Sequence, residues 1–386
     1  MSNAFIHRNL DAEIKRLSDY YAVIVITGPR QSGKTTLCKN LFPDYFYVNL
    51  EDITVRELIS SAPKAFLKQH IGGLIIDEVQ QYPDLFSYIQ VIVDENPNCH
   101  FILTGSSNFS LMQSVTQSLA GRAATLTLLP LSLSELGDQA NSTTDTLMIN
   151  GGYPAVWSKL IPVQDVSRNY YNTYIERDVR QLLNIKDIIK FQIFLRLCAG
   201  RIGNEFNASA LSNETGVSVP TINEWLSTLE ASYILFRLPP FYRNIGKRLT
   251  KAPKIYFYDT GLVCFLLGIE TEQQLSNHPL RGAIFENLVV LEFIKSRYNS
   301  GKNINLYYYR DQSQREVDLI QEFGNTYAAY EIKSATSFNK DFFSNLQYLK
   351  KILGETLNCT QVIYDGEIDT EVAENGIVNF RRISFP

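Results

Sequence analysis

The amino-acid sequence predicts an α/β fold with a parallel sheet, followed by further, smaller domains. The apolar run "YAVIVIT" at 21–27 precedes a glycine-rich turn and then a helical pattern. Four more apolar runs alternate with helical segments, as parallel strands joined by crossover helices do. These runs lie at 45–51, 74–76, 99–107 and 123–129. A hairpin pattern near residue 325 predicts a separate α/β unit near the C-terminus.

The glycine-rich turn is "GPRQSGKTT", residues 28–36, which fits the pattern G-x-x-x-x-G-K-[ST]. A strand of β-branched residues precedes it, and we expect a helix from Lys34 to Phe42. In such a turn, successive backbone N–H groups point at one anion at a helix N-terminus. Lys34 would reach the β- and γ-phosphates of a nucleoside triphosphate, and Thr35 would ligate Mg²⁺. The alternative is a glycine-rich turn without a ligand. The residues expected around the phosphates are Gly28, Pro29, Arg30, Gln31, Ser32, Gly33, Lys34, Thr35 and Thr36.

A pair of acids supplies the second part of this site. The short apolar run at 74–76 ends in Asp77 and Glu78. Because parallel strands end at one edge of the sheet, both acids should lie near the glycine-rich turn. Asp77 would hold Mg²⁺ through water, and Glu78 would polarise the attacking water as general base. The pair therefore predicts hydrolysis as well as binding.

The composition is ordinary for a globular protein. The length of 386 residues predicts two or three domains, and the formal net charge of −4 argues against a globally basic nucleic-acid-binding protein. The five cysteines show no C-x-x-C spacing, so neither a zinc site nor a disulfide framework is predicted. No apolar run reaches the ~18 residues of a membrane helix, and no signal peptide opens the chain. We therefore expect a cytoplasmic protein without membrane contact.

Motifs along nearly the whole chain resemble bacterial and archaeal ATPases of the AAA superfamily, whose C-terminal half is a domain of unknown function. The motifs are "GPRQSGKTT", "LIIDEVQ", "ILTGSSN", "LAGR…LLPLSLSEL", "GGYPAVW", "YIERDV", "KIYFYDTGL", "RGAIFEN", "EVDLI" and "EIKSA". The resemblance implies ATP and Mg²⁺ as ligands. With the helical patterns it gives four expected domains: a P-loop core at 1–135, a helical lid at 136–200, a winged helix at 201–272 and a restriction-endonuclease-like domain at 273–386.

The resemblance also implies roles for single residues near the nucleotide. Ser107 or Asn108, at the tip of the fourth strand, would be the sensor, and Arg8 would lie close to the nucleotide. Arg122, in "LAGR", would be an arginine finger for a neighbouring subunit, which requires a homo-oligomer. A structural ion pair is the alternative for Arg122.

The most periodic helical stretch is "YYNTYIERDVRQLL", residues 170–183. In AAA-type ATPases such a segment closes over the nucleotide. Arg177 or Arg180 would then touch the γ-phosphate, and a solvated charged face is the alternative for both residues.

The stretch 207–240 predicts two helices around a turn at Gly216 and then a strand, which is the outline of a winged helix. The second helix offers acids and amides rather than the basic residues of a DNA-reading helix. A basic segment follows instead, formed by Arg243, Lys247, Arg248, Lys251 and Lys254. As a wing or loop it would hold the phosphates of DNA or RNA without reading sequence. A protein-docking or intersubunit surface is the alternative.

Two alternating apolar–polar runs flank Gly324-Asn325, which is a two-residue hairpin signal. If Phe323 faces Thr326, Asp318 lies opposite Glu331. One face of the hairpin would then carry Glu316, Asp318, Glu331 and Lys333, and the other, buried face would carry Val317, Leu319, Tyr330 and Ile332.

Two opposite carboxylates repel each other, and a divalent cation is the simplest compensation. With Lys333, Asp318 and Glu331 resemble the metal-dependent nuclease fold of restriction enzymes and junction resolvases. The resemblance implies Mg²⁺ or Mn²⁺ on the two acids, with Lys333 orienting the hydrolytic water. Glu286, on the preceding helix, would be a further ligand. The alternative is that Lys333 only neutralises a charged patch in an inactive domain.

Three functions are compatible with these patterns. The first is an ATP-driven nucleic-acid enzyme that uses both the nucleotide site and the C-terminal acids. The second is a nucleotide switch that recruits a partner and cleaves nothing. The third is a DNA-binding ATPase whose C-terminal domain serves as a platform.

Overall fold

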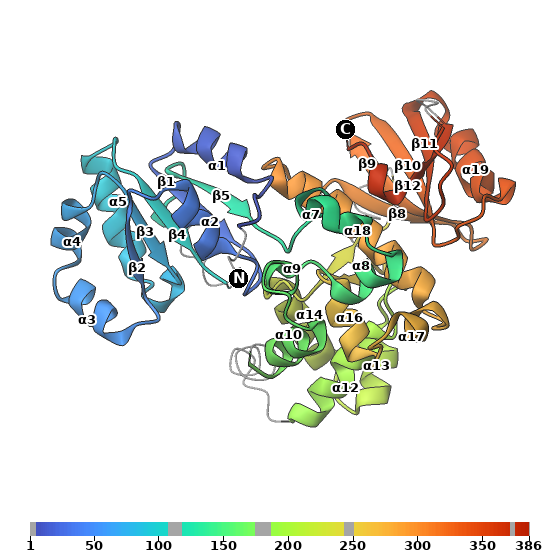
Figure 1. Ribbon diagram of the computed structural model, residues 1–386, viewed down its shortest axis with the longest axis horizontal. Helices are drawn as coiled ribbons and strands as arrows, with labels where there is room; N and C mark the ends of the chain where they lie inside the picture. Colours follow the sequence, from blue (N-terminus) through green and yellow to red (C-terminus); the bar gives the residue numbers. More distant parts are fainter. Residues whose placement is uncertain (1–4, 107–117, 174–186, 243–250, 371–374, 386) are drawn as a thin grey trace.

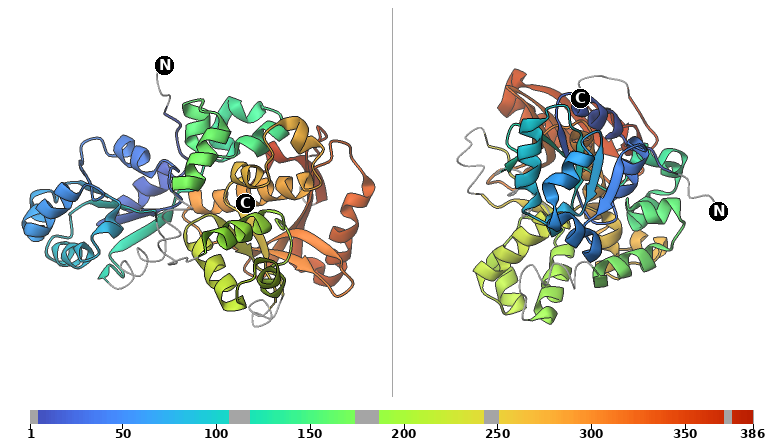
Figure 2. Two further views of the ribbon diagram at one scale, coloured as in Figure 1. Left: turned by 90° about the horizontal axis from the view of Figure 1, so that it is seen from below. Right: turned by 90° about the vertical axis from the view of Figure 1, so that its left-hand side faces the viewer.

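The computed structural model describes residues 5–106, 118–173, 187–242, 251–370 and 375–385. Two five-stranded sheets lie at opposite ends of the molecule, and a helical part lies beside them (Figure 1). The left view of Figure 2 shows that the N-terminal sheet, in blue, stands apart from the remainder. Among the described residues, no helix is both long and apolar enough to cross a membrane.

The N-terminal sheet is parallel throughout, in the order β2-β3-β4-β1-β5. Its strands are β1 (Val23–Thr27), β2 (Phe46–Asn49), β3 (Leu74–Asp77), β4 (Phe101–Thr104) and β5 (Ala123–Thr127). Strand β1 consists entirely of β-branched residues and is buried along its whole length, as expected for a strand covered on both faces. This sheet confirms the predicted α/β class.

Helices cover both faces of this sheet. They are α1 (Asp11–Ser18), α2 (Lys34–Leu41), α3 (Ile53–Ser61), α4 (Pro63–Gln69) and α5 (Leu85–Glu95). Because side chains alternate along a strand, Val23 and Val25 join the cluster of Ile89 on α5, whereas Ile24 joins the cluster of Leu37 on α2. The sheet therefore separates two hydrophobic cores.

The helical part follows β5 and includes one two-stranded antiparallel sheet. Its elements are α7 (Leu133–Leu136), α8 (Thr144–Asn150), α9 (Pro154–Ser158), α10 (Val163–Tyr170), α12 (Ile188–Ala199), α13 (Ala208–Thr215), α14 (Val219–Ala231), β6 (Leu235–Leu238), β7 (Lys254–Phe257), α16 (Thr260–Leu266) and α17 (Glu272–Ser276). Helix α13 ends at Gly216, whose φ of +66° favours glycine. The winged-helix assignment stays a prediction.

The C-terminal part begins with the long helix α18 and contains the second sheet, in the order β12-β11-β10-β9-β8. Its elements are α18 (Arg281–Asn299), β8 (Leu306–Arg310), β9 (Glu316–Phe323), β10 (Thr326–Lys333), α19 (Ser344–Leu353), β11 (Leu357–Tyr364) and β12 (Asn375–Asn379). Strands β8, β9 and β10 are antiparallel, whereas β10, β11 and β12 are parallel. Phe293 of α18 packs against Tyr330, while Leu349 of α19 shares a cluster with Ile320, so the two helices cover opposite faces.

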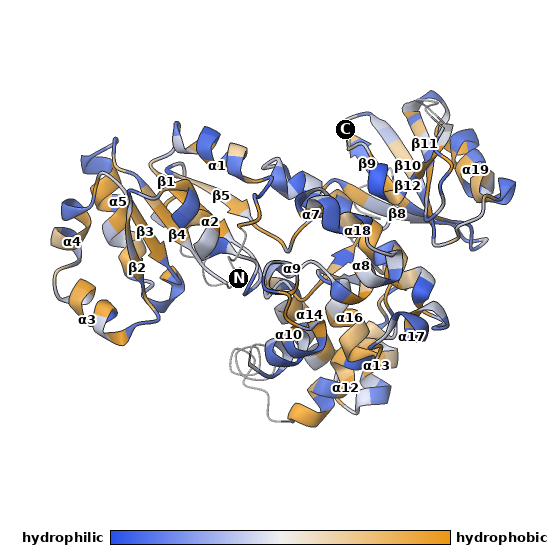
Figure 3. Ribbon diagram, in the orientation of Figure 1, coloured by the Kyte–Doolittle hydropathy of each residue, from blue (hydrophilic) through white to orange (hydrophobic). Residues whose placement is uncertain are grey.

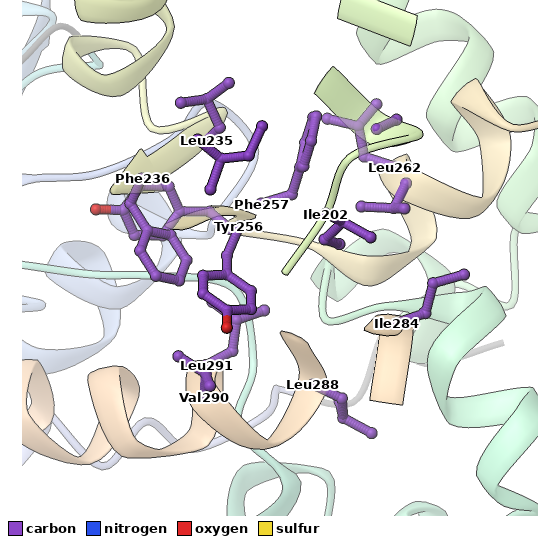
Figure 4. Packing of buried hydrophobic residues seen from close by; sticks show 14 of the residues in the cluster. Ile202, Leu235, Phe236, Tyr256, Phe257, Leu262, Ile284, Leu288, Val290 and Leu291 are labelled. Atoms are coloured by element: carbon purple, nitrogen blue, oxygen red, sulfur yellow. The ribbon is translucent and has the colours of Figure 1, made fainter. Parts of the chain in front are cut away.

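One hydrophobic cluster extends from Leu129 to Phe380 and joins the helical part to the C-terminal sheet. Figure 4 shows Tyr256 of β7 between Leu235 of β6 and Leu291 of α18. Figure 3 shows that the strands of the N-terminal sheet are mainly hydrophobic, whereas the helices around them carry both hydrophilic and hydrophobic residues. Residues from all four predicted domain ranges contribute to this cluster, and the domain boundaries stay predictions.

Candidate functional site

The predicted phosphate loop joins β1 to α2 at the carboxyl end of the first sheet. Gly28 has a φ of +143°, and a Cβ there would lie 2.2 Å from the carbonyl oxygen of Leu128, so only glycine fits. Gly33, with a φ of +96°, begins α2. The buried ammonium of Lys34 donates hydrogen bonds to the carbonyl oxygens of Gly28 (2.9 Å) and Pro29 (2.8 Å). Burial lowers the pKa of Lys34 to about 8.

A cavity of ≈ 920 Å³ opens beside this loop. Arg30, Gln31, Gly33, Lys34, Thr35 and Thr36 line its first wall. The facing wall comes from α9 and α10, in the segment predicted as a lid, and includes Pro154, Val166 and Asn169. Cavities of roughly 300–1,000 Å³ are typical of small-molecule sites, so the space suits a nucleotide.

Asp77, at the end of β3, is held by side chains from three other elements. Its Oδ2 accepts hydrogen bonds from Thr35 Oγ1 (2.7 Å) and from the Tyr47 hydroxyl (2.9 Å). Its Oδ1 accepts one from Thr104 Oγ1. The structure therefore brings together Thr35 and Asp77, the two residues predicted to serve Mg²⁺. Sequence reasoning missed Tyr47, which carries no local signal, and Thr104, whose signal was its place at a strand end.

Glu78 borders the cavity directly after Asp77. Its backbone has a φ of +52°, which is uncommon for a residue other than glycine and is a feature of functional sites. Its Oε2 accepts hydrogen bonds from Ser106 Oγ (3.1 Å) and from the Gln80 amide. Ser106 was not predicted, because the resemblance pointed to the next two residues. Those two, Ser107 and Asn108, lie outside the described residues.

Arg8 lies beside the phosphate loop, where the resemblance expects it. Its guanidinium is buried and donates to the carbonyl oxygens of Ser32 (2.7 Å) and Leu129 (2.6 Å). It also donates to Oε1 of Glu135 (3.0 Å), a residue of α7. Arg8 therefore fixes the loop to the segment that leads from the first sheet into the helical part.

Arg122 forms an ion pair with Asp94 of α5, with its Nε and Nη2 atoms 2.5 and 2.9 Å from the two carboxylate oxygens. Both side chains are partly exposed. The structural ion pair, which is the alternative role for Arg122, is thus present within one chain. The role of Arg122 as an arginine finger stays a prediction. Arg177 and Arg180 lie outside the described residues.

The C-terminal hairpin turns at Gly324-Asn325, as predicted. Phe323 pairs with Thr326, and the ladder keeps this register as far as Leu319 and Tyr330. Beyond that pair, the Asp318 carboxylate accepts a hydrogen bond of 2.7 Å from the backbone N–H of Ile332. Asp318 thus replaces a backbone ladder bond with a side-chain bond to the neighbouring strand.

The predicted faces of this hairpin were wrong at Val317. The pairing of β8 with β9 shifts by one residue between Tyr307 and Tyr309. Val317 therefore shares a cluster with Ile320 on the α19 side, whereas Leu319 belongs to the cluster on the α18 side. A shift of one residue moves a side chain to the other face of a sheet, and no local sequence pattern signals this shift.

Four acids and two lysines gather where β7, α18, β9 and β10 meet. We call them the charged cluster: Glu286, Glu316, Asp318, Glu331, Lys254 and Lys333. The Lys333 ammonium lies 3.2 Å from Glu331 Oε1 and 3.6 Å from Asp318 Oδ2, so the three predicted nuclease-like residues meet. Burial and the charge of Asp318 raise the pKa of Glu331 to about 8.

The prediction that Glu286 acts as a metal ligand is not met in this conformation. Its Oε1 accepts hydrogen bonds from the Lys254 ammonium (3.1 Å) and from the Tyr256 hydroxyl. Within the described part of the chain, no group of three or more acidic, histidine or cysteine side chains has an arrangement that could hold a metal ion. The charged cluster is therefore not an assembled metal site.

The prediction that Lys254 contacts phosphates was wrong. Its side chain lies in the core with 1% of its surface exposed, and its ammonium is 2.6 Å from Glu316 Oε1. A lysine held by two acids away from solvent cannot bind a polyanion. Lys251 is exposed. The other members of the basic segment, Arg243, Lys247 and Arg248, lie outside the described residues.

Three families match successive parts of the chain. An AAA domain matches residues 20–137, and two domains of unknown function, DUF8612 and DUF4143, match residues 141–273 and 281–383. The Walker-type ATPase PABY2304 of Pyrococcus abyssi, a solved structure, shares 14% identity and a TM-score of 0.46 over 68% of this chain and 96% of that chain.

Two curated relatives match most of the length. The uncharacterised protein MJ1544 of Methanocaldococcus jannaschii is 24% identical over an alignment of 398 residues, which covers 93% of this chain and 85% of that protein. The uncharacterised protein Rv2008c of Mycobacterium tuberculosis is 30% identical over 368 residues, which cover 93% of this chain and 80% of that protein. The chain therefore belongs to the family of Rv2008c, and its N-terminal part is an AAA-type P-loop domain.

Proposed function

We propose that this protein binds ATP in the cavity between the phosphate loop and helices α9 and α10, and hydrolyses it to ADP and phosphate. The hydrogen bond between Thr35 and Asp77, beside the buried ammonium of Lys34, carries the proposal. Lys34 and Thr35 belong to α2, which follows β1, and Asp77 is the last residue of β3. The three groups meet because β1 and β3 end at the same edge of the sheet.

Each group has a distinct task in this proposal. The loop N–H groups and Lys34 hold the β- and γ-phosphates, while Thr35 and Asp77 hold Mg²⁺, which would neutralise charge on the phosphate oxygens. Glu78 accepts a proton from water as the water oxygen bonds to the γ-phosphorus and the bond to the β–γ bridging oxygen breaks. Ser106 and Gln80 orient the Glu78 carboxylate.

The test is a calorimetric titration of ATP and Mg²⁺ into the full chain. Lys34→Ala should abolish binding, because the phosphates lose the ammonium that the loop itself supplies. Lys15→Ala, an exposed lysine on α1, is the matched control and should bind like the wild type. Unchanged affinity in Lys34→Ala would refute the assignment.

For the C-terminal part, the charged cluster in this conformation favours a nucleotide switch that cleaves nothing over a nuclease that is coupled to ATP hydrolysis. Lys254 neutralises Glu286, one of the acids predicted to hold a catalytic metal, together with the neighbouring Glu316. We propose that wild-type protein with Mg²⁺ or Mn²⁺ leaves DNA and RNA uncut, and appearance of cleavage products would disprove this.

Contact with nucleic acid would then depend on Arg243, Lys247, Arg248 and Lys251. In that case affinity falls as salt rises, and a flat response would exclude phosphate contact.

A further inference from the structure

We propose that Glu292 and Lys295, on helix α18 of the C-terminal part, position one wall of the ATP cavity and so contribute to ATP affinity. This role rests on the ATP function proposed above. Leu131, on the connection from β5 to α7, borders the cavity. Its backbone is held by α18, so a helix of the C-terminal part supports the nucleotide site.

The two side chains of α18 hold this connection by directed hydrogen bonds. The Lys295 ammonium donates to the carbonyl oxygen of Leu131 (2.7 Å) and to Glu292 Oε1 (2.9 Å). The second oxygen of Glu292 accepts a hydrogen bond of 2.9 Å from the backbone N–H of Leu133. Each of the two side chains exposes only 5% of its surface. A buried ion pair often adds little stability over apolar side chains of similar size, so we infer that this pair serves to fix the backbone.

The other side of the same connection is held at the phosphate loop. The Arg8 guanidinium donates to the carbonyl oxygen of Leu129 and to the carboxylate of Glu135. The same guanidinium donates to the carbonyl oxygen of Ser32, within the loop. The connection therefore lies between the phosphate loop and α18, with a buried cation on each side.

The facing wall of the cavity is attached to the same residue. The backbone N–H of Leu131 donates a hydrogen bond of 2.7 Å to the carbonyl oxygen of Gly152. Pro154, two residues further along, borders the cavity. The N–H of Gly152 in turn donates to the buried carboxylate of Asp259, directly before α16 (2.7 Å). A displacement of the Leu131 backbone would therefore change the spacing between the two walls.

Helix α18 connects this wall to the C-terminal sheet. Phe293 packs against Tyr330 of β10, while Glu292 and Lys295, its neighbours on the helix, hold the connection. A change in ATP affinity caused by the position of α18 implies the reverse effect of equal size. ATP binding should therefore stabilise α18 in its place against the connection.

The experiment measures ATP affinity by calorimetry and ATPase kinetics in the full chain. Glu292→Gln/Lys295→Met removes both charges together, because a single substitution would leave one buried charge unpaired. The double variant should bind ATP roughly fivefold to tenfold more weakly. Its KM should rise while kcat stays unchanged, since Asp77 and Glu78 keep their places on β3 and directly after it.

The matched control is Asp145→Asn/Arg281→Met, which removes an ion pair between α8 and the first residue of α18. It should lower the melting temperature and leave ATP affinity unchanged. Equal losses of affinity in both double variants would indicate general loosening of α18 and would overturn the proposal. Wild-type affinity in Glu292→Gln/Lys295→Met would overturn it as well, leaving a purely structural ion pair. Wild-type protein that binds no ATP would instead refute the ATP site itself.

A measurement on the wild type decides the question if the double variant does not fold. Hydrogen–deuterium exchange in peptides covering 129–136 and 288–298 should slow when ATP and Mg²⁺ are added. The exchanging N–H of Leu133 is the one that Glu292 holds, so its rate reports on this contact. A peptide from β11 should keep its rate. Slowing confined to the phosphate loop, or equal slowing in β11, would count against the proposal.

Discussion

The hydroxyl of Thr35 donates a hydrogen bond of 2.7 Å to Oδ2 of Asp77. This contact connects α2, the helix after the phosphate loop, to β3, which lies two strands away from β1 in the sheet. Both side chains therefore face one point beside the cavity. A cation placed there would find both oxygens in position without movement of either element. The predictions below follow from this arrangement.

Glu78→Gln should bind ATP with unchanged affinity and hydrolyse it about 10²-fold more slowly, because the amide cannot accept the proton of water. Phosphate release measures the rate, and calorimetry measures the affinity. Glu51→Gln is the matched control, since Glu51 also borders the cavity but pairs with Arg30. Equal losses in both variants would remove Glu78 as the base.

If Arg122 is a finger, Arg122→Ala should lower ATPase turnover about 10³-fold. Asp94→Ala breaks the same ion pair and should leave turnover intact, so the two variants separate catalysis from structure. Mixing inactive Arg122→Ala with inactive Lys34→Ala should restore part of the activity, because one hybrid site is then complete. No recovery on mixing would exclude action in trans.

Arg8→Met should destabilise the protein by about 3–5 kcal/mol, because it leaves the Glu135 carboxylate buried without its cation. Adding Glu135→Gln should recover most of this stability but not the ATP affinity, since Ser32 of the loop would still lack its partner. Thermal unfolding and calorimetry give the two quantities. Recovery of both would reduce Arg8 to a structural role. Arg16→Met removes an exposed ion pair and should have little effect.

Gly28→Ala should destabilise the chain by about 2–4 kcal/mol, through a clash with the Leu128 carbonyl oxygen and a backbone angle that alanine resists. Gly72→Ala is the matched control, because its added Cβ meets nothing within 4 Å. Denaturant unfolding compares the two. Similar stabilities would contradict the tight approach of β5 to the loop.

ATP binding should take up about half a proton at pH 8 and about a tenth at pH 7, because a pKa near 8 leaves Lys34 partly neutral before phosphate favours its charged form. Heats of binding in two buffers of different ionisation enthalpy measure this uptake. Lys34→Arg stays charged and should show none if it binds. Buffer-independent heats for the wild type at pH 8 would show that Lys34 is already protonated.

Local patterns were enough for the strands of the N-terminal sheet and for the β9–β10 hairpin of the second sheet. The alternation around Gly324-Asn325 set the register of the β9–β10 hairpin as far as Leu319, because a two-residue turn leaves no freedom of pairing. The one-residue shift between β8 and β9 depends on a partner strand, so the same pattern misplaced Val317.

The sequence by itself determined the phosphate loop, the acids at the end of β3 and the hairpin, since each rests on residues close together in the chain. Only the tertiary structure decided what the charged side chains do. Arg8 meets Glu135, and Lys254 meets Glu286 and Glu316, across long separations in the chain. A charge in a sequence has no partner until folding removes it from water. An unpaired buried charge is unfavourable, so a buried charged side chain needs a partner of opposite charge. Lys254, which was predicted to bind phosphates, is for this reason the counter-ion of buried acids.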